Sequence, residues 1–315
     1  MHLWRGLYNV PKQFTGCVAT IGNFDGMHLG HQALLRALSV QAQAYNLPSL
    51  VIIFEPQPKE FFAPDKAPAR IASFREKIQA FERCGVDYVL CLPFNQRFRS
   101  LCANSFIEKV LVDTIKVKHL IIGDDFRFGH DRSGDFALLQ QAGQKHDFNV
   151  QDTNTVATQG ERVSSTRVRE ALAAGDLTEA AKLLGRAYSM SGRVAYGRQL
   201  GRTLNTPTAN IMVKRIRLPL TGVFAAKVID EHNGEQYTGV ASVGIKPTIT
   251  NTPEPSLEVH LFDVNKNLYH RHLTVEFLQK IREEKKFNGL EELKAAIEAD
   301  KTTARQILSQ LTAKP

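Results

Sequence analysis

The sequence predicts an α/β domain built on a parallel sheet, followed by a small antiparallel β-barrel with a C-terminal helix. Up to about residue 185, short apolar segments alternate with helix-like segments, which is typical of a parallel sheet with helices on both faces. After that point the segments are short and rich in β-branched and aromatic residues, which favours an antiparallel barrel. A length of 315 residues also suggests about two domains. We therefore predict domains over residues 1–184 and 185–315.

Each element of the first half follows from its hydrophobic pattern. The predicted strands are CVATI, SLVIIF, VDYVLCL and HLIIG. The helix-like runs that alternate with them are QALLRALSVQAQAY, SFREKIQAFERCG, NSFIEKVLVDTI and GDFALLQQAGQKH. In the second of these helices, Ser73 is a suitable N-cap and Gly85 a suitable stop. In such a sheet the ligand site lies beyond the carboxyl ends of the strands.

The second half contains six strand-like segments and one helix. The strands are predicted at YSMSGRVAYG, TANIMV, GVFAAKVID, QYTGVASVGI, LEVHLFDV and HLTVEFLQKI. The sequence HNGE, residues 232–235, contains the Asn-Gly pair that marks a hairpin turn. A final helix is predicted from about Gly289 to Leu311.

Composition limits the class of protein. The formal charge of +8 and the pI of about 9.3 suit anionic partners, either nucleic acid or nucleotides and phosphates, without choosing between them. No apolar run reaches the roughly 18 residues of a membrane span, and the N-terminus lacks the apolar stretch of a signal peptide. The four cysteines show no CxxC spacing. We expect reduced thiols in a cytoplasmic protein.

The stretch TIGNFDGMHLGHQALL places two histidines where a strand turns into a helix. His28 and His31 lie three residues apart, with Gly22, Gly26 and Gly30 around them. A helix start offers free N–H groups and a partial positive charge to a phosphate, and glycine allows close approach of the backbone. Two imidazoles there are suited to donate hydrogen bonds to a phosphate in a transition state. Ordinary turn residues and a metal-binding pair are the alternatives.

A second polar stretch, RVSSTRVREAL, begins another amphipathic helix. Ser165 and Thr166 are hydroxyl residues at its start, where N-capping residues are common. Together with the guanidinium groups of Arg162, Arg167 and Arg169, they are suited to hold a polyphosphate. The alternative is a well-capped surface helix with solvated arginines.

The second half has its own candidates for phosphate chemistry. Gly197 and Gly201 flank basic residues, which suits a flexible loop over phosphates. Thr208 and Asn210, in TPTAN, offer a hydroxyl and an amide oxygen, which are ligands suited to Mg²⁺; an ordinary turn leading into a strand is the alternative. Glu258 is either a general base or a solvated residue.

Strand alternation predicts which face carries Glu258. Leu257 and Val259 are apolar, so Glu258 and His260 are expected to share the opposite face of their strand. A carboxylate on that face could be a solvated outward residue or a general base.

Several of these motifs together resemble one family. GNFDGMHLGH is similar to the GxFDGxHxGH signature of small-molecule nucleotidyltransferases, and VSSTRVR is similar to their SSTxxR element. FEPQPKEFF and GDDFRFGHDRSGD resemble further blocks of the FMN adenylyltransferase module, whose fold is Rossmann-like. PTAN, GVASVGIKPT, LEVHLFD and IREEKKF resemble the riboflavin kinase module, a small antiparallel barrel. The whole chain therefore resembles the bacterial bifunctional riboflavin kinase/FMN adenylyltransferase (FAD synthetase) family.

For the first half, the resemblance implies attack of the FMN phosphate on the α-phosphorus of ATP, with release of pyrophosphate. His28 and His31 would hold the triphosphate without any protein nucleophile. The further positions implied to contact nucleotide or flavin are Gly22, Asn23, Asp25, Gly30, Asp125, Arg127, Arg162, Ser165, Thr166 and Arg169. The chain departs from the family at Gln57, where histidine is usual; Gln57 can form hydrogen bonds but cannot carry charge.

For the second half, the resemblance implies phosphorylation of riboflavin by ATP. Thr208 and Asn210 would help to hold Mg²⁺-ATP, and Glu258 would take the proton from the ribityl 5′-hydroxyl as it attacks the γ-phosphate. Arg282 would lie against the flavin or a phosphate, and the loop with Gly197 and Gly201 would cover the nucleotide. Two mild departures are Asn205 in place of glycine and Ser242 in place of asparagine.

Taken together, these implications describe a cytoplasmic enzyme that makes FMN and then FAD from riboflavin and two ATP molecules. Its partners would be small molecules, with no nucleic acid and no membrane, and the oligomeric state is left open. A rival is an aminoacyl-tRNA-synthetase-like enzyme, since HLGH resembles that superfamily's HIGH box, although SMSGR replaces the lysine-rich loop. A nucleic-acid-binding module is the other rival, although the basic residues are scattered.

Overall fold

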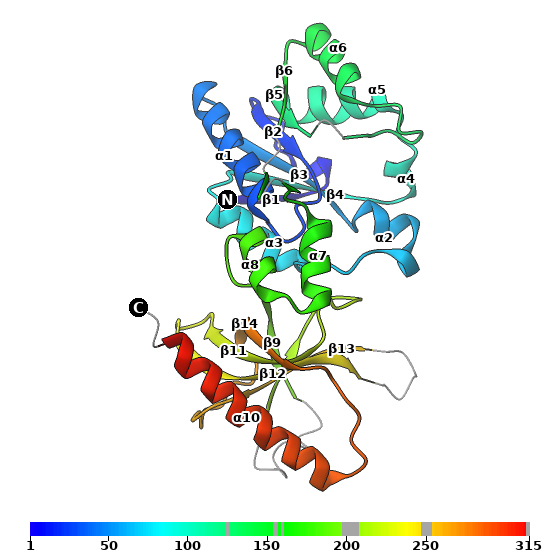
Figure 1. Ribbon diagram of the computed structural model, residues 1–315. Helices are drawn as coiled ribbons and strands as arrows, with labels where there is room; N and C mark the ends of the chain where they lie inside the picture. The colour runs from blue at the N-terminus through cyan, green and yellow to red at the C-terminus, as the bar shows by residue number, and fades with distance from the viewer. Residues whose placement is uncertain (124–125, 154–156, 159–160, 197–207, 247–253, 313–315) are drawn as a thin grey trace. The chain divides into compact units, whose positions relative to one another are not determined.

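The computed structural model describes residues 1–123, 126–153, 157–158, 161–196, 208–246 and 254–312 (Figure 1). Contacts between residues divide the chain into two compact units. The first unit comprises Met1–Pro68 and Phe74–Val163, and the second comprises Ala69–Ser73 and Ser164–Pro315.

The first unit contains a six-stranded sheet covered by helices (Figure 1). Its strands are β1 (His2–Arg5), β2 (Cys17–Ile21), β3 (Ser49–Glu55), β4 (Tyr88–Pro93), β5 (Val117–Ile122) and β6 (Asn149–Asp152), with a small ribbon of β7 (Ala157–Thr158) and β8 (Glu161–Arg162). Its helices are α1 (Leu29–Ala44), α2 (Pro58–Phe62), α3 (Phe74–Arg83), α4 (Gln96–Arg99), α5 (Ala103–Phe106) and α6 (Phe136–His146), with the π-helical segment η3 (Ile107–Thr114) and the 3₁₀ turns η1 (Leu7–Asn9) and η2 (Pro64–Lys66).

The predicted parallel sheet is confirmed. Its strand order is β1-β4-β3-β2-β5-β6, and all neighbouring strands are parallel. The chain moves outward from β2 through β3 to β4, and then crosses to the other side of β2 to form β5 and β6. The direction of winding therefore reverses between β2 and β5, which is where sheets of this kind bind their ligands.

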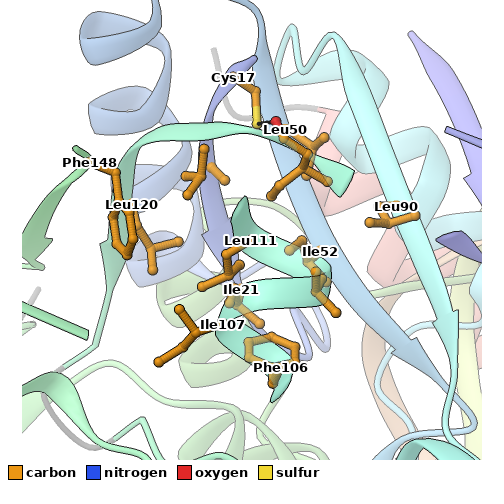
Figure 2. Packing of buried hydrophobic residues seen from close by; sticks show 14 of the residues in the cluster. Cys17, Ile21, Leu50, Ile52, Leu90, Phe106, Ile107, Leu111, Leu120 and Phe148 are labelled. Carbon is orange, nitrogen blue, oxygen red and sulfur yellow. Dashed lines mark hydrogen bonds between the residues drawn. The ribbon is translucent and has the colours of Figure 1, made fainter. Parts of the chain in front are cut away.

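Alternation along the central strands gives the sheet two apolar faces. Cys17 and Ile21 of β2 pack toward η3 and α6, whereas Val18 packs toward α1 and α3. Figure 2 shows Ile107 and Leu111 of the π-helical segment against the first of these faces. Because β2 is buried along its whole length, the start of the following loop has little freedom to move.

The second unit contains two helices, a six-stranded barrel and the last helix. These elements are α7 (Ser165–Ala174), α8 (Leu177–Leu184), β9 (Ser189–Ala195), β10 (Thr208–Met212), β11 (Gly222–Asp230), β12 (Gln236–Lys246), β13 (Glu254–Leu261), β14 (His272–Arg282) and α10 (Leu290–Thr312).

The predicted antiparallel barrel and C-terminal helix are confirmed. The barrel closes in the order β10-β13-β12-β11-β14-β9, and its neighbouring strands are antiparallel. The predicted hairpin joins β11 to β12, with Gly234 at φ 74° in the turn. Ala304 and Ile307 of α10 pack against Phe262 and Ala225, so the helix covers one part of the barrel's outer surface.

Two predictions from composition can be compared with this structure. All four cysteines are free thiols, as their spacing predicted. Across the described part of the chain, no helix is long and apolar enough to cross a bilayer.

A short segment from the first half of the chain, Ala69–Ser73, belongs to the second unit. The buried guanidinium of Arg215 donates to the carbonyl oxygens of Arg70 at 3.3 Å and Ile71 at 3.0 Å. Tyr188 donates its hydroxyl to the same Ile71 oxygen at 3.0 Å. The contacts therefore divide the chain near residue 163 rather than 184, and the predicted boundary at 184/185 stays a prediction.

Arg215→Ala is expected to lower the free energy of unfolding by about 2–4 kcal/mol. The substitution leaves two carbonyl oxygens without their charged donor, and each such loss costs roughly 1–3 kcal/mol. Urea titration followed by circular dichroism measures the change. Lys214→Ala, at the exposed neighbouring position, is the control and should stay within about 0.5 kcal/mol of the unmutated chain. Equal stability of the two variants would contradict the role given to Arg215.

Candidate active site

The loop between β2 and α1 is held in an unusual backbone conformation. Phe24 and Met27 have φ values of 47° and 49°, which are uncommon for residues with side chains, and Gly26 has φ 84°. Both side chains are buried, at 1% and 4% exposure, and so anchor the loop to the core. Backbone strain that is fixed in this way is common at functional sites. The loop thereby presents its polar residues beyond the carboxyl end of β2.

His28 caps the N-terminus of α1. Its Nδ1 accepts a hydrogen bond from the backbone N–H of His31 at 3.3 Å. Because an accepting nitrogen carries no proton, the neutral ring carries its proton on Nε2 and presents a donor there. A Cβ on Gly30 would come within 3.2 Å of the His28 ring, so glycine at that position leaves room for the imidazole.

His31 stacks on His28 and stays neutral. The ring centroids are 3.6 Å apart with an interplanar angle of 18°. Burial, and then the neighbouring His28 and Lys77, hold the pKa of His31 well below its usual value. Its Nδ1 is buried without a hydrogen-bond partner in the protein. Within the described residues, no group of three or more His, Cys, Asp and Glu side chains is placed to share a metal ion.

The remaining predicted residues of this loop divide by burial. Asp25 is buried at 2% exposure, whereas Asn23 is exposed. A Cβ on Gly22 would lie 3.0 Å from the Phe24 ring, and the Gly22 N–H donates to Ile52 of β3 at 3.1 Å. Gly22 therefore ties the loop to the neighbouring strand.

Gln57 lies after the carboxyl end of β3 and is the N-cap of α2. Its backbone N–H donates to Glu60 Oε2 at 2.9 Å, which fixes the start of the short helix. The Gln57 side chain is only 6% exposed, and its Nε2 is buried without a hydrogen-bond partner in the protein. A buried amide donor without a partner is costly, and in a binding site a ligand can satisfy it.

Aromatic rings gather after the same ends of β3 and β4. Phe61 and Phe62 each pack edge-on against Phe94, with centroids 5.5 and 5.6 Å away. Phe62 is 56% exposed, and the Arg99 guanidinium lies 5.1 Å from its ring centroid. Our sequence prediction assigned no role to these rings, although the pair in FEPQPKEFF was visible. A large exposed ring at the carboxyl ends of the strands, where sheets of this kind bind their ligands, offers a surface for a planar aromatic ligand.

The hydroxyl-rich segment forms the start of α7 in the second unit. Ser164 caps the helix and accepts from the Arg167 N–H at 3.3 Å, while Ser165 is half-buried and Thr166 exposed. Arg167 and Arg169, which were expected to hold phosphate, make contacts within the protein. Arg167 pairs with Glu179 at 2.7 Å, and Arg169 Nε donates to the Ala69 carbonyl at 2.7 Å.

Three other residues of this half were predicted to contact nucleotide or flavin, and the structure describes two of them. Arg162 is exposed in β8 of the first unit. Arg127 is exposed and donates to the carbonyl of its neighbour Phe126 at 3.1 Å. Asp125 lies outside the described residues.

The barrel brings the candidates of the second half into one row. Asn210 of β10 lies directly opposite Glu258 of β13, and Thr208 lies opposite His260. On its other side Glu258 is opposite Ser242 of β12. These five residues are half-buried. The register places a carboxylate, an amide and hydroxyls together on one face of the barrel wall.

The face predicted for Glu258 is confirmed. Leu257 and Val259 are buried at 1% and 0% exposure in the barrel core, and Glu258 and His260 alternate with them on the outer side. The role of Glu258 stays a prediction.

Arg282, at the end of β14, is held by α10. Its Nε and a terminal nitrogen donate to the two carboxylate oxygens of Asp300 at 2.8 and 2.7 Å. The other terminal nitrogen donates to the Glu283 carbonyl at 2.9 Å. The guanidinium is therefore fixed in position, and its predicted contact with flavin or phosphate stays a prediction. Gly197 and Gly201 lie outside the described residues.

Comparison with known proteins identifies the family of the chain. A family model described as FAD synthetase matches residues 10–167, and one described as riboflavin kinase matches residues 184–308. A bifunctional riboflavin kinase/FMN adenylyltransferase from Pseudomonas fluorescens is 52% identical over 307 residues, covering 98% of each chain. A protein of the same description from Escherichia coli K12 is 49% identical, and the alignment covers 97% of each chain. The chain belongs to this bifunctional family.

A solved structure also has this family's fold. It is described as a macrolide-efflux protein from Streptococcus pneumoniae, and it aligns with a TM-score of 0.79 and 29% identity over 96% of this chain and 98% of its own. That description applies to the pneumococcal protein. Membership of the bifunctional flavin family rests on the two family models and on the full-length relatives.

Lowering the pH should destabilise the protein through His31. The folded state lowers the pKa of His31, so the unfolded chain binds the proton more readily. The stability that His31 contributes is complete above its unfolded pKa of about 6.5, and it is lost as the pH falls below that value. His31→Asn should therefore reduce the loss of unfolding free energy between pH 7.5 and 5.5 by about 1 kcal/mol in urea titrations. Identical pH dependence in the two proteins would contradict this assignment.

Proposed function

We propose that the two activities of this family are divided between the two halves of the chain. As a family member, the chain is a riboflavin kinase and FMN adenylyltransferase, which makes FMN from riboflavin and FAD from FMN. The histidine loop would serve adenylyl transfer, and the outer face of the barrel would serve phosphorylation. The observation that carries the division is that each half has its own polar constellation, His28 with His31 in one and Asn210 with Glu258 in the other.

In the adenylyl step, an oxygen of the FMN phosphate attacks the α-phosphorus of ATP and pyrophosphate leaves. The attacking oxygen is already ionised, so no protein base is needed. His28, with its proton on Nε2, and the neutral His31 would donate hydrogen bonds to phosphate oxygens as negative charge builds up. The N-terminus of α1 adds its free N–H groups and partial positive charge. Ser165, Thr166 and Arg169 would bind the outer phosphates, as the family motif implies.

The flavin of FMN would use the aromatic surface after β3 and β4. The exposed Phe62 ring, supported by Phe61 and Phe94, is suited to stack on a planar isoalloxazine. The buried Nε2 of Gln57 lies on the same strand-to-helix connection and offers an uncharged donor to the bound substrate. Since an amide does not titrate, this donor is the same at every physiological pH.

In the kinase step, the ribityl 5′-oxygen attacks the γ-phosphorus of ATP and ADP leaves. Glu258 would accept the proton of the hydroxyl as the new P–O bond forms. Asn210 is directly opposite Glu258, so a nucleotide held at β10 would present its phosphate to the base on β13. The strand pairing would thus bring the phosphate donor and the base close together.

Mg²⁺ is implied by the family, and the donors present fit it. Thr208 and Asn210 contribute a hydroxyl and an amide oxygen on the same side of β10, beside the Glu258 carboxylate. Hard oxygen donors of this kind, completed by phosphate oxygens and water, suit Mg²⁺. The ion would neutralise phosphate charge when bound. The residues that would hold it are Thr208 and Asn210.

Two further expectations remain proposals. The four free thiols support a reducing compartment, and we propose the cytoplasm. We also propose that the charge of +8 serves nucleotide substrates rather than nucleic acid. A gel-shift in moderate salt tests the second point, since retardation of RNA or DNA would favour the binding module.

The double substitution His28→Ala with His31→Ala should abolish FAD formation while FMN still accumulates. Loss of preorganised donors typically costs about 10²–10³ in rate for each donor, and neither histidine belongs to the barrel. Chromatography of products from riboflavin, Mg²⁺ and ATP measures both flavins. His146→Ala, at the end of α6, is the control and should make FAD normally. Unchanged FAD synthesis in the double variant would show that the histidines are only turn residues.

Glu258→Gln should nearly stop conversion of riboflavin to FMN and leave conversion of added FMN to FAD intact. The amide keeps the size of the side chain but removes the basic oxygen, and loss of a general base typically costs about 10²–10⁴ in rate. The exposed Glu254, four residues earlier on the same strand, provides the control variant Glu254→Gln. FMN formation at the unmutated rate in Glu258→Gln would remove Glu258 from the mechanism.

A further inference from the structure

The carboxylate of Glu284 lies directly on the backbone of Gly244. A Cβ built on Gly244 would come within 1.8 Å of Glu284 Oε2 and 2.0 Å of Oε1. No side chain fits at residue 244 while Glu284 keeps this position. Glu284 follows the end of β14 by two residues. Its contact with Gly244 shows that the side chain reaches β12. Glycine at position 244 leaves a notch in β12, and the carboxylate fills it.

This notch is next to the row of residues proposed for the kinase step. Ser242, two residues before Gly244 and on the same face of β12, is the cross-strand partner of Glu258. Gly244 is in turn opposite Ser256, two residues before Glu258 on β13. Diagonal neighbours of this kind in an antiparallel pair are about 7–8 Å apart. Glu284 thus adds a second carboxylate to the face that carries Glu258, on the β12 side.

The two sides of Glu258 have different chemistry. On the β10 side, Asn210 and Thr208 offer neutral oxygens suited to a magnesium-bound nucleotide. On the β12 side, the Glu284 carboxylate offers oxygen acceptors that suit the hydroxyl groups of a polyol. The β12 side therefore suits a polyol, and the β10 side suits a magnesium-bound nucleotide.

We propose that Glu284 positions riboflavin by accepting hydrogen bonds from the secondary hydroxyls of the ribityl chain. The terminal 5′-hydroxyl then lies at Glu258, and the rest of the chain runs over Ser242 toward the notch at Gly244. Glu284 takes no proton in the reaction; it orients the polyol so that the correct hydroxyl meets the base. This inference rests on the proposed kinase site on the outer face of the barrel.

Steady-state kinetics with two flavins test the proposal. One substrate is riboflavin, and the other is a flavin with a 5-hydroxypentyl chain at N10, which keeps the terminal hydroxyl and lacks the secondary ones. Glu284→Gln should lower kcat/KM for riboflavin about 10- to 100-fold, mainly through KM, since a hydrogen bond to a charged acceptor is lost. For the hydroxypentyl flavin, the variant and the unmutated enzyme should be equal.

A second variant tests the notch itself. Gly244→Ala should displace the carboxylate and reproduce the riboflavin defect of Glu284→Gln, and the double variant should be no worse than either single one. Glu283→Gln is the matched control, because Glu283 is exposed and pairs with Lys280 at 2.6 Å. Unchanged kinetics with the hydroxypentyl flavin report that the barrel of each variant is folded.

The outcomes separate this inference from the proposed function. Normal riboflavin kinetics in Glu284→Gln, or an equal defect with both flavins, would overturn the role of Glu284 even if Glu258→Gln is inactive. An active Glu258→Gln would instead overturn the kinase site on which the inference rests. Additive defects in the Gly244 and Glu284 variants would show that the notch does not act through the carboxylate.

Discussion

Backbone pairing between strands positions the central candidate groups of both halves of this protein, the histidine loop and the Asn210–Glu258 pair. In the first unit, parallel pairing of β2 with β3 and β5 aligns their carboxyl ends, and the histidine loop and the start of α1 follow from that edge. In the second unit, antiparallel register places Asn210 opposite Glu258 and Ser242 on the other side. Slipping either register by one residue would turn the side chains of that strand to the opposite face, away from their partners. In both halves, the position of the candidate groups therefore depends on main-chain hydrogen bonds between neighbouring strands.

Under the proposed assignment, the two halves would carry out phosphate chemistry in different ways. In the adenylyl step that we propose, the first would use the N-terminus of α1 and the histidine pair, in which capping orients the His28 ring and burial keeps His31 neutral. It works on a nucleophile that is already ionised, so positioning and electrostatic stabilisation are sufficient. The second must deprotonate an alcohol, and there the barrel wall offers a carboxylate next to oxygen ligands. Neither half requires a covalent intermediate on the protein.

Much of the fold was predictable from the sequence because the signals are local. Hydrophobic runs, helix caps and the Asn-Gly turn each depend on a few neighbouring residues, and they gave the parallel sheet, the barrel and the last helix. Strand alternation also gave the outward face of Glu258. Contacts between distant residues were not predictable. No local pattern indicates that Arg215 holds the carbonyl groups of Arg70 and Ile71, or that Gly244 makes room for Glu284. Motif residues also acquired structural partners, as Arg167 did with Glu179.

The central claim is that one chain first transfers the γ-phosphate of ATP to riboflavin and then transfers AMP from a second ATP to the product. The most direct measurement incubates the full chain with riboflavin, Mg²⁺ and ATP labelled either at the γ- or at the α-phosphorus, and separates the flavins over time. We predict that FMN carries only the γ-label, and that the FAD formed later carries both the γ-label and the α-label. FAD lacking the γ-label, or a failure of either label to enter any flavin, would contradict the account.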